Sequence, residues 1–189
     1  MDSLRQRLKR FGADLHPQVD EAFSALALQT PQGYRRFLLA HAAALFGLEQ
    51  RLERNAIQRL LSDWPQRRRT PALLADLRAL GCDLGSAPAT AGEASPGWCW
   101  GAVYVLEGSR LGAQLLARDL QRAQPGAPMH YLSHGPAATL WPSFLQQLEA
   151  AAPQCREDQL RCGVEEAFGL FLSGARGQLE EALRPPCPA

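Results

Sequence analysis

The sequence predicts an all-α protein that folds as one irregular helical bundle. Apolar residues recur at intervals of three and four along most of the 189 residues, which is the spacing of one helix face. The short β-prone run Val103-Tyr104-Val105 lies inside a long helical pattern, so it does not argue for a sheet. No internal repeat divides the chain, whose length suits one domain. We therefore expect a helical domain over residues 1–183 and a flexible tail over residues 184–189.

Apolar spacing and helix-start signals place the helices of the N-terminal half. Both Thr30-Pro31 and Thr70-Pro71 put a proline in the first turn of a helix, where its missing N–H is not needed. Gly81 ends the helix that Thr70 begins. The basic run Arg67-Arg68-Arg69 is expected to be a solvated loop between helices, since no aromatic residues are interleaved with it. The predicted helices are residues 2–28, 30 to about 53, 55–62 and 70–80.

Two segments rich in Gly, Pro and small residues separate the helices of the C-terminal half. They cover residues 85–97 and 124–135, and the second contains His130 and His134, which we expect to be exposed. His41, beside an apolar helical stripe, is instead expected to be a core or boundary histidine. The predicted helices are residues 97 to about 123, 137–151 and 155–183.

The bulk composition excludes several classes of protein. The chain has 20 basic and 19 acidic residues, so its formal charge of +1 gives no general attraction to nucleic acid or an anionic membrane. No apolar run approaches the roughly 18 residues of a membrane span, and the charged N-terminus has no signal-peptide core. Five cysteines, with no Cys-x-x-Cys pair, are expected to be buried residues or free thiols. We therefore expect a cytoplasmic protein with no nucleic-acid or membrane partner.

The most informative segment is the run from Tyr104 to Leu116, which reads as a helix with Gly108 and Gly112 near its middle. An interior glycine costs a helix about 1 kcal/mol relative to alanine. Two glycines four residues apart share one face, and they remove the side chains from that patch of helix. Their spacing indicates that another group approaches the backbone there, either a ligand or a second helix.

His16 is the histidine whose neighbours favour ligand binding. Asp20 follows at i+4, within reach of a ring N–H, and a carboxylate behind an imidazole is typical of a metal-binding histidine. Lys9 precedes His16 by two turns on the same face, about 10 Å along the helix axis. A cation at that position suits an anionic group on a large flat ligand. The alternative is an ordinary surface pair, because His and Asp often occur at this spacing.

These pieces occur together in one family. The chain resembles the heme oxygenases, and most closely the bacterial branch associated with phytochromes, over about residues 4 to 180. The specific part is the run Tyr104-Val105-Leu106-Glu107-Gly108-Ser109-Arg110-Leu111-Gly112. The supporting matches are Leu8-Lys9 with Leu15-His16 and Val19-Asp20, Gly33-Tyr34-Arg35-Arg36-Phe37-Leu38, and Arg69-Thr70-Pro71-Ala72-Leu73-Leu74-Ala75-Asp76-Leu77.

The resemblance implies an all-helical heme-oxygenase fold, with heme between a proximal and a distal helix. It implies that His16 is the axial iron ligand, that Asp20 supports it, and that Lys9 meets a heme propionate. Gly108, Ser109 and Gly112 would form the distal, catalytic face. One neutral histidine leaves the sixth position of the iron free for dioxygen.

The reaction that the resemblance implies is oxidative opening of heme to biliverdin, carbon monoxide and ferrous iron. It uses dioxygen and electrons from a donor such as ferredoxin or a reductase, and a phytochrome is a possible receiver of the product. Two alternatives remain. One is a carrier or sensor of the same fold that binds heme or another tetrapyrrole without cleaving it. The other is a helical interaction module without a cofactor, whose glycines only allow close helix packing.

Three residues depart from the wider family pattern. Ser109 stands where animal-type members carry an acidic residue that organises water, as in the bacterial branch. Ala113 replaces the second glycine of a common Gly-Gly pair. Pro17 follows His16 directly, and a proline inside a helix removes a hydrogen bond and clashes with the preceding turn. The proximal helix therefore either kinks at Pro17 or restarts with this proline at its beginning.

Overall fold

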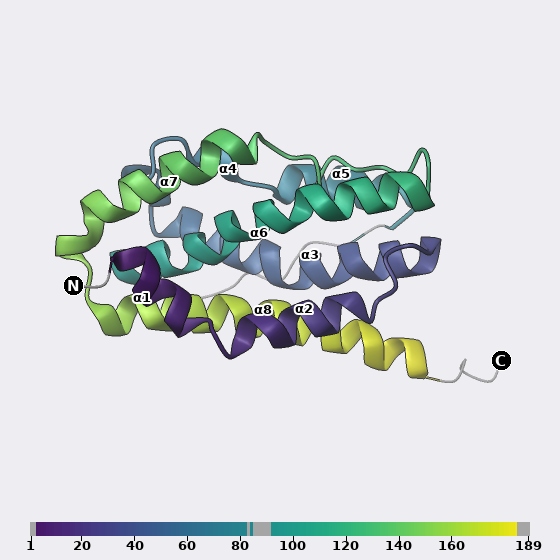
Figure 1. Ribbon diagram of the computed structural model, residues 1–189, viewed down its shortest axis with the longest axis horizontal. Coiled ribbons are helices and arrows are strands. Elements are labelled where there is room, and N and C mark those ends of the chain that lie inside the picture. Colours follow the sequence, from purple (N-terminus) through teal and green to yellow (C-terminus); the bar gives the residue numbers. More distant parts are fainter. Residues whose placement is uncertain (1–2, 83, 85–91, 185–189) are drawn as a thin grey trace.

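The computed structural model describes residues 3–82, 84 and 92–184, and these residues form an all-α structure without strands, as predicted (Figure 1). No helix among them is long and apolar enough to cross a membrane. The α-helices are α1 (Leu4–Phe11), α2 (Leu15–Ser24), α3 (Pro31–Arg54), α4 (Trp64–Arg67), α5 (Thr70–Ala79), α6 (Pro96–Ala123), α7 (Ala137–Ala151) and α8 (Glu157–Leu183), with the 3₁₀ turns η1 (Ile57–Arg59) and η2 (Ala152–Gln154).

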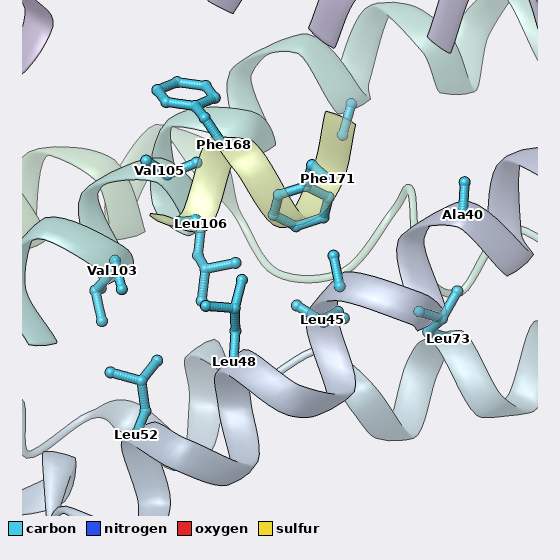
Figure 2. Packing of buried hydrophobic residues seen from close by; sticks show 14 of the residues in the cluster. Ala40, Leu45, Leu48, Leu52, Leu73, Val103, Val105, Leu106, Phe168 and Phe171 are labelled. Carbon is cyan, nitrogen blue, oxygen red and sulfur yellow. The ribbon is translucent and has the colours of Figure 1, made fainter. Parts of the chain in front are cut away.

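The three long helices α3, α6 and α8 run lengthwise through the molecule and form its core (Figure 1). Figure 2 shows Val103 and Leu106 of α6, Leu48 of α3 and Phe171 of α8 among the side chains buried between them. Each of these side chains is at most 5% exposed. Burying side chains of this size gives about 1.5–3 kcal/mol each, so this interface stabilises the fold.

Two glycines bring α6 and α8 into close contact. A Cβ added at Gly101 would overlap the carbonyl oxygen of Leu160, and one added at Gly163 would overlap the carbonyl oxygen of Trp98. In each case the obstacle is backbone, which cannot move aside. The position of α6 on α8 therefore depends on these two residues having no side chain.

The predicted single helix over residues 2–28 is wrong, because the chain breaks into α1 and α2. A continuous helix would press the ring of Pro17 against the carbonyl of Ala13, four residues earlier. The observed α2 begins at Leu15, so Pro17 lies in its first turn, where the missing N–H costs nothing. The restart of the helix, one of the two outcomes expected for Pro17, is therefore the one found. Gly12 at the break fits closely against Phe168 of α8.

The segment between α3 and α5 also differs from the prediction. Residues 55–62 form only the short turn η1, which Ala56 enters with a left-handed backbone (φ 54°). The expected solvated loop at 67–69 is wrong, since Arg67 is 1% exposed and Arg69 2% exposed. Only Arg68 of this run lies at the surface, where it pairs with Glu53 at 3.3 Å.

The C-terminal half agrees with the prediction within a few residues, including the start of α6 near residue 97 and the bounds of α7 and α8. Cys82 and Cys99 are buried, and Cys155 and Cys162 are free thiols nearer the surface, as expected. Most of the predicted loop 85–97, Cys187 and the tail from residue 185 lie outside the described residues.

Candidate functional site

His16 is the second residue of α2, and its ring lies at the surface beside α8. Its Nδ1 is 3.1 Å from Oδ2 of Asp20, and the two side chains are 63% and 67% exposed. A neutral imidazole with its proton on Nδ1, facing this carboxylate, would present the lone pair of Nε2. One edge of the imidazole packs against Phe168, with ring centres 5.7 Å apart. The predicted pairing of His16 with Asp20 is therefore present, and Nε2 has no hydrogen bond to a described residue.

Lys9 lies in the last turn of α1, on the other side of the helix break from His16. Its side chain is exposed and forms no ion pair with any residue that the structure describes. Because α1 and α2 are separate helices, the relation of Lys9 to His16 is not that of residues seven apart on one helix. Both helices nevertheless pack against α8, so Lys9 and His16 remain on neighbouring elements.

Gly108 and Gly112 lie on α6, which continues unbroken through both. An added Cβ at Gly112 would meet nothing within 4 Å, and one at Gly108 would touch only the side chain of Trp141, at 3.8 Å. At Gly101 and Gly163, by contrast, an added Cβ would overlap the backbone of the neighbouring helix. The expected bare patch of helix is therefore present, and within this fold it does not serve helix packing.

The same face of α6 carries two large apolar side chains in solvent. Leu111 is 49% exposed and Leu115 is 61% exposed, at i+3 and i+7 from Gly108. Residues at this spacing share one face with Gly108 and Gly112. Figure 1 shows α2 and α6 on the same side of the molecule, in front of α3. The imidazole of His16 and this apolar, partly bare face of α6 are both exposed to solvent.

Ser109, next to Gly108, receives a hydrogen bond from a buried arginine that sequence reasoning placed in a loop. Nη2 of Arg69 donates to Oγ of Ser109 and to the carbonyl oxygen of Leu106, both at 2.9 Å. Ser109 cannot itself supply a charge, but the guanidinium of Arg69 supplies a positive one beside it. The sequence pointed to Arg69 only as the first residue of the matched segment that begins α5. Its burial could not be predicted, because a run of like charges is typical of a solvated loop.

Glu107 holds α6 in place through a network of buried charges. Its Oε2 accepts from Nη1 of Arg67 at 2.7 Å, and its Oε1 accepts from Nε of Arg110 at 2.9 Å. Arg67 also forms two bonds with Asp63, and these bonds hold the pKa of that carboxyl below its ordinary value. Glu107 of the glycine-bearing motif thus acts in the fold, where it ties α6 to α4.

Asp76 of α5 fixes the segment of residues 124–135, which connects α6 to α7. Its fully buried carboxylate accepts from the backbone N–H groups of His130 and Tyr131, at 2.9 and 2.8 Å, and from Nδ1 of His130 at 2.6 Å. The exposure predicted for His130 is confirmed, but its Nδ1 is not free. His134 is half-buried rather than exposed, since Arg110 donates to its backbone oxygen at 2.8 Å.

His41 is a hydrogen-bonded core histidine inside an aromatic cluster, as expected. Its Nδ1 lies 2.8 Å from the carbonyl oxygen of Phe37, and its ring lies 4.4 Å from Phe23 of α2 and 5.1 Å from Tyr131. Burial lowers the pKa of His41 to about 3. This neutral ring packs against α2 one turn beyond Asp20, so it supports the helix that carries His16.

Comparison with known proteins identifies the family. A heme oxygenase of Xanthomonas campestris pv. campestris (strain 8004) is 36% identical over 149 residues, and the match covers 73% of this chain and 86% of that protein. The structure of the Neisseria meningitidis heme oxygenase, solved with NO and CO bound, superposes with a TM-score of 0.82 over 99% of this chain and 96% of that one. The identity there is 20%, so this likeness establishes the fold. No family model matches the chain. The identity to the Xanthomonas protein, over most of both chains, shows that this protein belongs to the heme oxygenase family.

Proposed function

We propose that this protein opens heme oxidatively, releasing biliverdin, carbon monoxide and ferrous iron, with dioxygen and external electrons as co-substrates. Membership of the heme oxygenase family supports this proposal. The single observation in the structure that carries it is the bare face of α6 at Gly108 and Gly112. Bare backbone over a flat ligand leaves room for a small second substrate, and side chains there would fill that room.

The residues present fit heme. Heme needs one neutral imidazole nitrogen, apolar surface for its faces and a cation for its propionates. With the ring proton on Nδ1, facing Asp20, the neutral imidazole of His16 offers Nε2 to the iron. Leu111 and Leu115 offer exposed apolar surface beside the glycines, and Lys9 is an exposed cation. When bound, heme supplies both the iron at which dioxygen is activated and the macrocycle that is cleaved.

Each of these residues has a proposed task. His16 binds the iron, and Asp20 fixes its tautomer and ring orientation. Lys9 pairs with a propionate and thereby orients the heme in its plane. Ser109 orders a water on the distal side, and Arg69, which donates to Ser109 Oγ, keeps that hydroxyl in one orientation. Gly108 and Gly112 keep the space above the heme open.

We also propose that the protein acts in the bacterial branch that supplies biliverdin to phytochromes. Ser109 in place of an acidic residue, within the run Tyr104–Gly112, supports this assignment. The electrons would come from a ferredoxin or a reductase. Mixing the product with an apo-phytochrome tests the branch, because assembly shifts the bilin absorption to longer wavelength.

Titration with hemin, followed by product analysis, tests the function. We expect a saturable Soret band in the wild-type protein and no such band in His16→Ala. Ascorbate or reduced ferredoxin should then convert the bound heme to biliverdin in a single turnover. A stable ferrous–oxy spectrum without biliverdin would indicate a carrier instead. No saturable band in the wild-type protein would contradict both functions.

A further inference from the structure

A small cavity lies behind the bare face of α6, between that helix and the segment of residues 131–137. Its volume is about 80 Å³, well above the roughly 10–15 Å³ that a single water needs. Its polar lining includes Arg69, Arg110, Tyr131 and His134, and none of the described residues that line it is acidic. Both arginines are at least 97% buried, at 2% and 3% exposure. The cavity is therefore a sheltered, basic site.

The guanidinium of Arg69 has only neutral partners. Its Nη2 donates to the carbonyl oxygen of Leu106 and to Ser109, and its Cζ lies 5.1 Å from the centre of the Tyr131 ring. The nearby carboxylate of Glu49 accepts from the backbone N–H of Arg69 at 2.6 Å and from that of Thr70 at 2.9 Å. Within the described residues no ion pair neutralises this guanidinium. A buried cation without a charged partner is costly, and a counter-ion would reduce that cost.

The second arginine of the lining, Arg110, has an ion-pair partner, but this pair does not compensate the charge of Arg69. Arg110 shares Glu107 with Arg67, and Arg67 also pairs with Asp63, so these two carboxylates are taken up by these two guanidinium groups. Burial, followed by the charge of Arg69, lowers the pKa of Arg110 below its ordinary value. Burial and then the charges of Arg110 and Arg69 likewise lower the pKa of His134. Burial is the larger cause of both shifts, and the neighbouring guanidinium groups act in the same direction.

Two further groups on the lining are available as donors. Nη1 of Arg110 lies 3.2 Å from Nδ1 of His134, and since a guanidinium only donates, that nitrogen accepts and the ring proton is on Nε2. Neither Nε2 of His134 nor the hydroxyl of Tyr131 is hydrogen-bonded to a residue that the structure describes. Arg69, His134 and Tyr131 therefore present unused donors and a positive charge around one small space.

We propose that this cavity binds one small inorganic monoanion, of the halide or nitrate class, between Arg69, Tyr131 and His134. The guanidinium of Arg69 has no ion-pair partner among the described residues, which favours one negative charge, and the volume excludes organic phosphates. The site is separate from the proposed heme face, because it lies on the opposite side of α6 from Gly112. Arg69 joins the two sides, since the same guanidinium holds Ser109.

Thermal unfolding of the heme-free protein in sodium chloride and in sodium gluconate, at equal ionic strength, tests this proposal. An ion that binds only the folded state raises Tm by mass action, and at ten times its Kd the expected rise is about 3–6 °C for a chain of this length. We expect this rise with chloride and not with gluconate, which is too large for the cavity. Arg69→Met should abolish the chloride response, and Ala113→Ile, which fills the cavity without changing its charge, should reduce it strongly.

Arg118→Met is the matched control, because it removes an exposed arginine from the same helix. It should retain the full chloride response, and so should Lys9→Ala, which removes the cation proposed for a propionate. The proposal is overturned if the wild-type protein shows no chloride-specific rise, so that the cavity holds water only. It is also overturned if Lys9→Ala abolishes the rise or Arg69→Met retains it. If Arg69→Met does not fold, an undiminished response in Ala113→Ile overturns it.

Discussion

Nδ1 of His16 and Oδ2 of Asp20 lie 3.1 Å apart across one turn of α2, with both side chains largely exposed. This pair favours the neutral imidazole tautomer in which Nε2 is free to bind a metal. Asp20→Asn should keep the shape of the pair but remove its charge, and it should lower hemin affinity or activity about 10- to 100-fold. A hemin titration followed by a turnover assay measures both effects.

Glu21→Gln is the matched control for this substitution, because it removes the neighbouring exposed carboxylate of α2. It should leave hemin binding unchanged. Equal losses in Asp20→Asn and Glu21→Gln would mean that the general charge of α2, rather than the pair with His16, matters.

Gly108→Leu should retain hemin binding but lose turnover. A Cβ at Gly108 meets only Trp141 at 3.8 Å, so the heme-free fold accommodates a side chain, while the space over the heme is filled. Single-turnover formation of biliverdin is the measurement. Gly177→Leu is the control, since a Cβ there also meets nothing within 4 Å but lies on α8. Full activity in Gly108→Leu would show that this face of α6 does not cover the heme.

Gly163→Ala should destabilise the protein by about 1–3 kcal/mol, because the new methyl group presses against the carbonyl of Trp98 and forces α6 away from α8. Gly177→Ala, in the same helix but in open space, should instead stabilise it by about 0.5–1 kcal/mol. Urea unfolding curves of the two variants give both values. A stable Gly163→Ala variant would argue against the tight α6–α8 contact.

Acid should weaken the fold through His41. Burial, which is the main cause, and the charge of Arg69 lower its pKa from 6.5 to about 3 in the folded state. The unfolded chain therefore binds more protons between these two values, and stability falls as the pH falls from 6.5 towards 3. At pH 5 the loss from this group alone is about 2 kcal/mol relative to neutral pH.

His41→Phe provides the test of this pH dependence, because it keeps an aromatic ring in the cluster but removes the titrating group. Urea unfolding at pH 7.5 and pH 5 should show a smaller loss of stability in the variant than in the wild-type protein. Equal losses in both would mean that His41 is not buried as described.

Local signals explain why much of the fold was predictable. The Pro-initiated helix α3 and the glycine-bearing helix α6 depend on patterns within a few residues, and the structure places both close to their predicted bounds. Pro17 predicted a disturbance of the first helix but not its place. The break lies at Gly12, where the chain fits against Phe168, a residue that is distant in the sequence.

The sequence by itself determined the helical class, the pairing of His16 with Asp20 and the glycine spacing on α6, because each depends on the helical repeat. Only the tertiary structure decided which glycines face backbone and which face open space, since all of them look alike in a helical pattern. It alone also buried Arg69 and joined it to Ser109 across 40 residues of chain. Whether a cation is buried depends on the hydrogen-bond partners and the packing that other helices provide. A local sequence pattern contains information on neither.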